Sequence, residues 1–206
     1  MENYSVTVSR EFGCGAREIC QTLAKKLGIA FYDQDLIDLT AQRAGIRKDE
    51  IQDMEAVIGQ EKAEKLLGQF LYGSTMNFYS DKAIIVQADV IRELAEKGPA
   101  IFFGRCSNYF LKEKENCLNI FLYAHLQDRI VHISKEYNLP AQSAAKLINR
   151  VDRQRHNYYK YVTGSNRGNR ESNNLMIDVG AFGKEGTVDL MADAIDNRFG
   201  IYRTED

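Results

Sequence analysis

The residues of this sequence best suited to chemistry lie near its start, where residues 5–20 read SVTVSREFGCGAREIC. Gly13 and Gly15 separate a β-branched run from a segment with apolar residues at helical spacing. A strand, a glycine loop and a helix in this order can bind an anion, because loop amides and the helix N-terminus point toward it. Arg10 and Arg17 add two cations. We expect a phosphate-binding loop, although a Gly-x-Gly segment can also form a simple tight turn.

This loop matches only part of the Walker A pattern, G-x-x-x-x-G-K-[ST]. If Gly15 is the second glycine, Arg10 stands at the first, Ala16 at the lysine, and Arg17 and Glu18 where the magnesium-binding hydroxyl is expected. Arg17 cannot simply replace the lysine, because one residue along a helix is a rotation of about 100°. The amides and the helix terminus remain, so we expect anion binding with Arg10 or Arg17 supplying the missing charge.

Further candidates follow two other short apolar runs. Gly104 and Arg105 come directly after residues 101–103. At the carboxyl end of a strand, an arginine is more often a phosphate or carboxylate clamp than a surface residue. Cys106 has no histidine nearby, which favours a packed thiol over a nucleophile. Asp33 follows the other run, residues 29–32, where it can cap a helix or contact a ribose or base.

A basic segment near residue 150 reads RVDRQRHNYYKY and includes Asp152, Arg153 and Arg155. It can be a solvated helix face, and basic residues interleaved with aromatics also occur in nucleic-acid-binding proteins. The near-neutral net charge and the glycine-rich polar stretch 164–174 favour a third interpretation. We predict a mobile lid over residues 150–174 that brings arginines over bound phosphates.

Composition narrows the class of protein. The chain has 206 residues, 44% of them apolar, and a net charge of −2, which predicts one domain without nucleic acid or a membrane as partner. No apolar run approaches the ~20 residues of a membrane-spanning helix. The four cysteines form no C-x-x-C pair, and the three histidines share no ligand spacing, so we predict a cytoplasmic protein without a metal site.

The elements that must position these residues alternate along the chain. Short apolar strands separated by helical patterns predict an α/β fold, a doubly wound five-stranded parallel sheet covered on both faces. Its strand carboxyl ends, and the ligand site, then share one edge. A charged helical stretch at 47–81 is the candidate insertion over that edge. The expected strands are 5–9, 29–32, 100–103, 118–123 and 175–177.

Five ordered segments carry a resemblance to a known family. They are SREFGCGAREI, FYDQDLI, IFFGRCSNYFL, IFLYAHLQDRI, and RVDRQRHNYYKYVTG followed by LMIDVGAFGKEG. Together they cover most of the chain, and the chain resembles the cytidylate kinase-like family of P-loop nucleoside monophosphate kinases. The resemblance implies ATP with Mg²⁺ as phosphate donor, and CMP, dCMP or a related nucleoside monophosphate as acceptor.

The resemblance also implies roles for single residues. Arg153 and Arg155 look like the family's lid arginines, and Arg105 looks like the arginine that contacts the monophosphate; these three are the candidate catalytic residues. Asp33, Arg105 and Asp152 are the candidates for binding the nucleoside monophosphate. Gly13 and Gly15 would cradle the donor phosphates.

The chain departs from classical cytidylate kinases at several positions. Ala16 and Glu18 replace the Walker lysine and hydroxyl, Gln34-Asp35 replaces a Thr-Gly pair, and Cys106 replaces an aspartate. These differences leave a second hypothesis open, in which the protein keeps the fold but has lost catalysis and serves as a nucleotide sensor or partner-binding protein.

Overall fold

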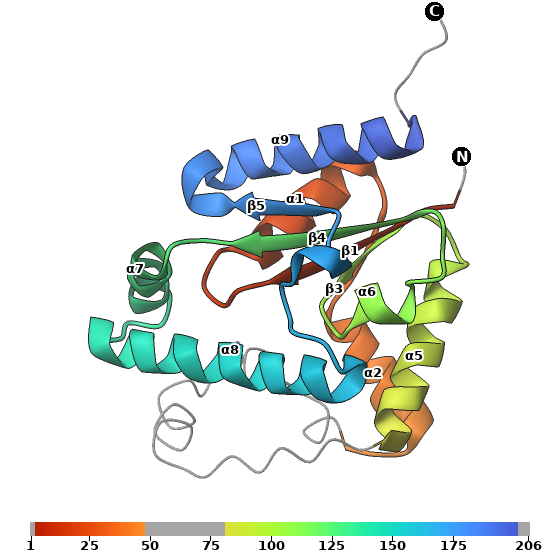
Figure 1. Ribbon diagram of the computed structural model, residues 1–206, viewed down its shortest axis with the longest axis horizontal. Helices are drawn as coiled ribbons and strands as arrows, with labels where there is room; N and C mark the ends of the chain where they lie inside the picture. The colour runs from red at the N-terminus through yellow and green to blue at the C-terminus, as the bar shows by residue number, and fades with distance from the viewer. Residues whose placement is uncertain (1–2, 48–80, 202–206) are drawn as a thin grey trace, which may run out of the picture.

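The computed structural model describes residues 3–47 and 81–201, and its centre is one parallel sheet (Figure 1). The strand order is β2-β3-β1-β4-β5, and every neighbouring pair is parallel. The expected five-stranded parallel α/β fold is therefore confirmed. The strands are β1 (Ser5–Arg10), β2 (Ala30–Tyr32), β3 (Ala100–Phe103), β4 (Cys117–Tyr123) and β5 (Leu175–Asp178).

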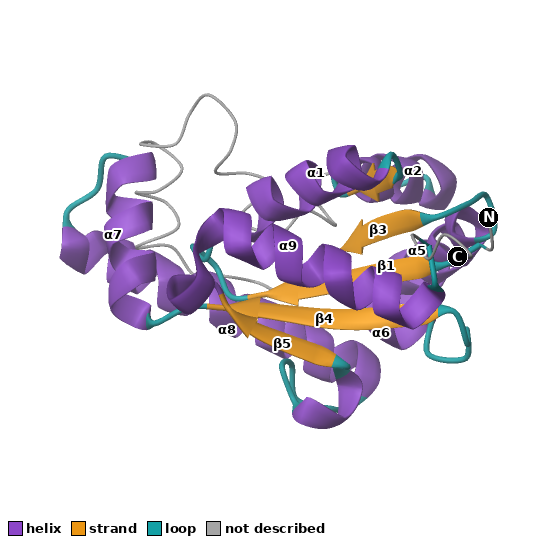
Figure 2. Ribbon diagram, turned by 90° about the horizontal axis from the view of Figure 1, so that it is seen from above, coloured by secondary structure: helices purple, strands orange, loops and turns teal. Residues whose placement is uncertain are grey.

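Helices lie on both faces of this sheet, as the view from above shows (Figure 2). α1 and α9 cover one face, and α8, α5 and α6 lie on the other. The described helices are α1 (Ala16–Leu27), α2 (Gln34–Ala44), α5 (Asp81–Ala95), α6 (Ser107–Phe110), α7 (Leu126–Glu136), α8 (Ala141–Thr163), α9 (Val179–Phe199) and the short 3₁₀-helix η2 (Arg170–Ser172).

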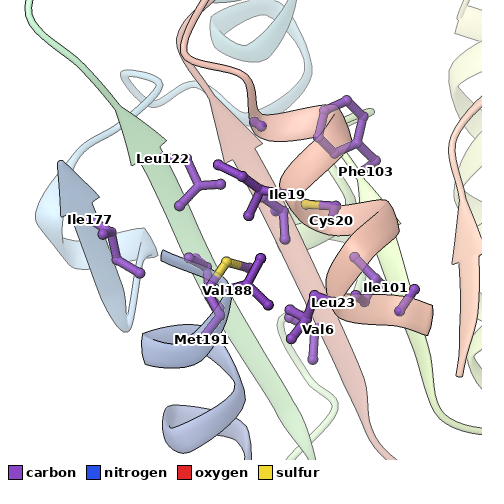
Figure 3. Packing of buried hydrophobic residues seen from close by; sticks show 14 of the residues in the cluster. Val6, Ile19, Cys20, Leu23, Ile101, Phe103, Leu122, Ile177, Val188 and Met191 are labelled. Atoms are coloured by element: carbon purple, nitrogen blue, oxygen red, sulfur yellow. The ribbon is translucent and has the colours of Figure 1, made fainter. Parts of the chain in front are cut away.

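The core is divided by the alternation of side chains along each strand. Ile101 and Phe103 of β3 pack in the layer under α1 and α9, whereas Phe102 packs in the layer under α5. Leu23 of α1 and Met191 of α9 both belong to the first layer (Figure 3). Burial on both faces explains why β3 is an unbroken apolar run, AIFF.

The strand register brings the carboxyl ends of β1, β3 and β4 to one edge. Val8 pairs with Phe103, and Arg10 pairs with Leu122. The amide of Gly104 donates to the carbonyl of Val8 at 2.9 Å, which ties the turn after β3 to the end of β1. Gly104 is thereby placed beside the loop that follows Arg10, although it lies far from that loop in sequence.

The expected strand positions hold to within one residue at each end. One helix differs more, because α9 begins at Val179 rather than near Gly186. The Asp178 carboxylate accepts a hydrogen bond from the Gly180 amide at 2.9 Å and caps this earlier start. The candidate insertion at 47–81 lies, except for its end residues, outside the described residues. No helix among the described residues is long and apolar enough to cross a membrane.

Candidate functional site

The loop between β1 and α1 contains two glycines in the left-handed region. Gly13 has a φ of +85°, and a Cβ there would lie 2.8 Å from Cγ1 of Ile133 in α7. Gly15 has a φ of +78° and stands at the N-cap of α1. Both positions thus require glycine, the first for close packing and both for backbone conformation. The loop has the strand–loop–helix form expected from the sequence.

A set of buried charges holds the backbone of this loop. The Asp152 carboxylate accepts hydrogen bonds from the Phe12 amide at 3.0 Å, from Arg129 Nη1 at 2.7 Å and from Arg167 Nη2 at 2.8 Å. Arg167 Nη1 donates to the carbonyl of Arg10. The bonds to Phe12 and Arg10 join the loop to α8 and to the segment after it, and the other two bonds join Asp152 to Arg129 and Arg167.

Arg129 completes this arrangement from α7. Its Nη1 donates to the Phe12 carbonyl at 3.2 Å and its Nε to the Ala124 carbonyl at 3.1 Å. Its Nε also lies 3.3 Å from the Glu11 carboxylate. We call Glu11, Arg129, Asp152 and Arg167 the buried clamp, after its arginine side chains, which are 9% and 11% exposed; the Asp152 and Glu11 side chains are 21% and 30% exposed.

Burial lowers the pKa of the Arg167 guanidinium from its usual value, and the Asp152 carboxylate opposes that effect. Two arginines and two carboxylates balance each other in the clamp, so the charges satisfy one another at low exposure. Their donors and acceptors point at loop backbone. The clamp therefore fixes the path of residues 10–12.

Two candidate cations lie on the side of the loop that faces β3. The guanidinium carbon of Arg10 is 3.9 Å from the ring centroid of Phe103, and that of Arg17 is 5.8 Å from it. Gly104 makes room for Arg10, because a Cβ there would lie 2.2 Å from Arg10 Nη1. Cation–π contact thus orients Arg10 at the sheet edge.

Asp33 lies beside these cations as an ion-pair partner. Arg17 Nε is 2.7 Å from an oxygen of the Asp33 carboxylate. Asp33 stands at the N-cap of α2 but makes no side-chain capping bond, so one of the two roles considered for it, helix capping through its side chain, is not found. The carboxylate is engaged by Arg17 instead.

The turn after β3 has an unusual backbone. Gly104, Arg105 and Cys106 have φ values of +76°, +58° and +56°. Non-glycine residues in this region carry a conformational cost, which is found preferentially at functional sites. The Arg105 carbonyl accepts a hydrogen bond from Gln87 at 3.1 Å, which helps to hold the turn. Burial raises the pKa of Cys106 to about 12, so its thiol stays protonated near neutral pH.

The basic segment lies in α8, and its arginines lie on different sides of that helix. Arg155 is buried, with its guanidinium carbon 5.6 Å from the Phe12 ring centroid, whereas Arg153 is exposed. Two residues along a helix are a rotation of about 200°, so these arginines point to nearly opposite sides. The structure brings Arg155 to the loop and leaves Arg153 away from it.

The stretch 164–174 has contacts that its composition did not suggest. Arg167 belongs to the buried clamp, and Gly168 fits against Phe121, whose Cζ would lie 2.9 Å from a Cβ at that position. The Asn174 amide donates to the Asn119 carbonyl at 2.8 Å. Movement of this stretch as a lid stays a prediction.

Sequence reasoning assigned no role to Arg129, Arg167 or Lys184. Lys184 lies at α9 and forms an ion pair with Glu18 of α1. Arg129 and Lys184 stand inside the segments IFLYAHLQDRI and LMIDVGAFGKEG, but no spacing rule relates either to the loop. Within residues 3–47 and 81–201, no group of three His, Cys, Asp or Glu side chains could hold a metal ion.

Comparisons with known proteins show which family and which solved structures this chain is similar to. The model of the cytidylate kinase-like family matches residues 5–181. No curated protein matches the sequence. Among solved structures, an uncharacterized protein from Eubacterium ventriosum ATCC 27560 is similar with a TM-score of 0.72 and 20% identity, over 95% of this chain and 99% of that one.

Two kinases share the fold more distantly. Shikimate kinase from Bacteroides thetaiotaomicron has a TM-score of 0.52 and 12% identity, over 94% of this chain and 98% of its own. A gluconokinase from Sinorhizobium meliloti 1021 has a TM-score of 0.52 and 11% identity, over 98% of each chain. At such identities the likeness concerns the fold alone. The match over residues 5–181 shows that the chain belongs to the cytidylate kinase-like family.

Proposed function

We propose that this protein is a nucleoside monophosphate kinase, which transfers the terminal phosphate of ATP to CMP, dCMP or a related nucleoside monophosphate. One observation carries the proposal. A glycine loop with a clamped backbone lies at the carboxyl edge of the sheet, and arginines from β1, α1 and α8 lie beside it. Phosphoryl transfer depends mainly on positioning and on neutralising charge, which such a set can supply.

The donor phosphates bind at the loop in this proposal. Amides at Gly13 and Gly15 face the phosphates together with the N-terminus of α1. Arg10 and Arg17 supply positive charge on the side of Phe103. Arg155 adds charge from α8, close to Phe12. Arg153 belongs to the proposed catalytic set only if the lid movement turns it toward the nucleotide.

The acceptor monophosphate binds at the turn after β3. Arg105 is held there in a left-handed backbone conformation, one residue beyond Gly104. Asp33 is proposed to lie between the two sites, because its carboxylate already holds Arg17 of the donor site. Asp152 contributes by holding the loop, since its oxygens already accept bonds from Phe12 and two arginines.

Magnesium accompanies ATP in the proposal, but the loop does not offer its usual ligand. Glu18 replaces the hydroxyl residue and pairs with Lys184. Mg²⁺ at such sites keeps several waters and binds substrate phosphates. We therefore assign no protein ligand to the ion.

A second function is favoured by one observation. The residue after Gly15 is Ala16, whose side chain is 4% exposed and packs in the core. A kinase fold without the loop lysine can bind nucleotides and signal or recruit a partner without turnover. This catalytically degenerate protein is the alternative to the kinase.

Turnover and binding, measured side by side, separate the two. The protein is incubated with ATP, Mg²⁺ and CMP, dCMP, UMP, AMP or GMP, while ADP formation is followed and ATP binding is measured by calorimetry. Turnover of at least one monophosphate supports the kinase, and binding without turnover supports the alternative. Absence of both contradicts the proposal.

Two arginine variants test in the same assay whether Arg105 binds the monophosphate. Arg105→Ala should raise KM for the monophosphate about tenfold or more, because a charge-assisted contact is lost. Arg43→Ala is the matched control, since Arg43 forms an exposed pair with Glu93 at the far end of α2. Equal effects of the two changes would contradict a monophosphate role for Arg105.

A further inference from the structure

A backbone break near the start of α9 determines where Lys184 lies. Gly183 has a φ of +67° and a ψ of 176°, so the first turn of α9 is separated from the remainder. Thr187 Oγ1 donates to the Gly183 carbonyl at 2.6 Å, at the start of the helix that follows. Lys184 is the first residue after the break, and its side chain extends toward α1.

Lys184 lies directly against the phosphate loop. A Cβ on Gly15 would be 3.2 Å from Lys184 Cε, and the Lys184 ammonium pairs with the Glu18 carboxylate. Core packing fixes the two helices relative to each other, because Leu23 of α1 and Met191 of α9 belong to one buried cluster (Figure 3). The contact therefore follows from the fold rather than from the ion pair.

The other cations around the loop are engaged differently. Arg17 is bound to Asp33 on a different side of α1, one residue and about 100° from Glu18. Arg167 donates to loop backbone and to Asp152 at 11% exposure. The Lys184 and Glu18 side chains are 44% and 65% exposed. Lys184 can thus leave its partner at little cost, because an exposed ion pair is weak.

We propose that Lys184 supplies the positive charge that Ala16 cannot, and that it binds the donor phosphate over Gly15. Glu18 holds the ammonium beside the loop until a phosphate group displaces it. This inference rests on the proposed function and adds a phosphate-binding residue from the other end of the sequence.

Electrostatics favours this exchange of partners. The N-terminus of a helix carries partial positive charge, so an ammonium over Gly15 needs an anion nearby. Glu18 provides one negative charge there. A triphosphate provides several, and it also accepts hydrogen bonds from the loop amides. Lys184 therefore gains more from the phosphate than from Glu18.

Opposite effects of two substitutions test the proposal. Lys184→Met should weaken binding of inorganic triphosphate, measured by calorimetry at low salt, by about tenfold or more. Glu18→Gln removes the competing carboxylate and should leave the affinity equal or tighter. Lys184→Arg keeps the charge and should retain most of the affinity.

The chain offers a matched control on the same two helices. Lys26 of α1 pairs with Asp189 of α9 at 2.7 Å, with side chains 49% and 66% exposed, close to the values of the pair under test. Lys26→Met should leave triphosphate affinity unchanged. Thermal unfolding of all variants should show similar midpoints.

Each remaining result overturns the inference. If Lys184→Met binds triphosphate as the parent does, Lys184 does not contact phosphate. If Lys184→Met and Glu18→Gln weaken binding equally, the pair acts as a structural link instead. If the parent binds neither triphosphate nor ATP, the proposed function fails, and this inference fails with it.

Discussion

The two sides of the phosphate loop hold their charges in different ways. Toward α7 and α8, the buried clamp places Arg129 and Arg167 at 9% and 11% exposure around Asp152. Toward α9, the pair of Lys184 and Glu18 is 44% and 65% exposed. The clamp arginines bond to backbone as well as to carboxylates, whereas Lys184 contacts Glu18.

The two arrangements suit different roles: a buried network can hold the loop in place, and an exposed pair can bind the ligand of the loop. A buried charge that loses its partner is costly, so a buried network resists rearrangement. An exposed pair contributes little stability and can exchange one partner for another. In the proposals above, the clamp therefore shapes the loop, and the exposed Lys184 can exchange Glu18 for a phosphate. Substitutions on the two sides of the loop test this difference in roles.

The largest expected effect is on the clamp side. Asp152→Ala removes the carboxylate that Arg129 and Arg167 share, and it leaves two buried cations facing each other. The free energy of unfolding should fall by about 3 kcal/mol or more. Urea unfolding followed by circular dichroism measures this change.

The matched control for that substitution is on the exposed side. Asp189→Ala breaks the exposed pair with Lys26 and should cost at most about 1 kcal/mol. Similar losses for Asp152→Ala and Asp189→Ala would show that the clamp does not stabilise the loop as a buried network.

The next prediction concerns the pH dependence of stability that arises from the buried thiol of Cys14 in the loop. Burial raises the pKa of Cys14 from 9.0 to about 11. The folded state then keeps a proton that the unfolded state releases, so the stabilising contribution is complete below pH 9 and is lost as pH rises toward 11. Over this range the free energy of unfolding should fall with pH in the parent more steeply than in Cys14→Ala. The difference between the two slopes should be ~1 kcal/mol per pH unit. Parallel slopes in urea titrations at pH 8 to 10.5 would contradict burial of this thiol.

At the turn after β3 we expect a smaller change in the free energy of unfolding, and here the substitution should stabilise the protein. Arg105 has a φ of +58°, which glycine adopts without steric cost. Arg105→Gly should therefore raise the free energy of unfolding by up to about 1 kcal/mol while weakening monophosphate binding. Arg105→Ala keeps the strain and should weaken binding without a gain in stability. If both variants are equally destabilised, the backbone of this turn is not strained.

The smallest effect expected is on the stretch 164–174. Arg167 ties it to the clamp, so lid movement requires the residues on either side of Arg167 to change their contacts. Hydrogen exchange at these amides should slow several-fold when ATP is added, because a closed lid is held by more bonds. Equal exchange with and without ATP would remove the lid hypothesis and leave this stretch as a fixed part of the clamp.

Much of the fold could be predicted from local patterns. Short apolar runs such as residues 100–103 are buried on both faces of the sheet, and burial selects their composition. Gly13 and Gly15 could be read as loop residues because they take backbone conformations that other residues avoid. The early start of α9 was missed, since its capping Asp178 belongs to the preceding strand.

The sequence by itself determined the strands, the glycine loop and the two arginines next to it in the chain, Arg10 and Arg17. The tertiary structure alone decided which charges meet around the loop. Asp152 and Phe12 are 140 residues apart, and Lys184 and Glu18 are 166 apart. Hydrophobic periodicity acts between neighbours along the chain, whereas an ion pair depends on distance in space, which is set when α7, α8 and α9 pack against the sheet.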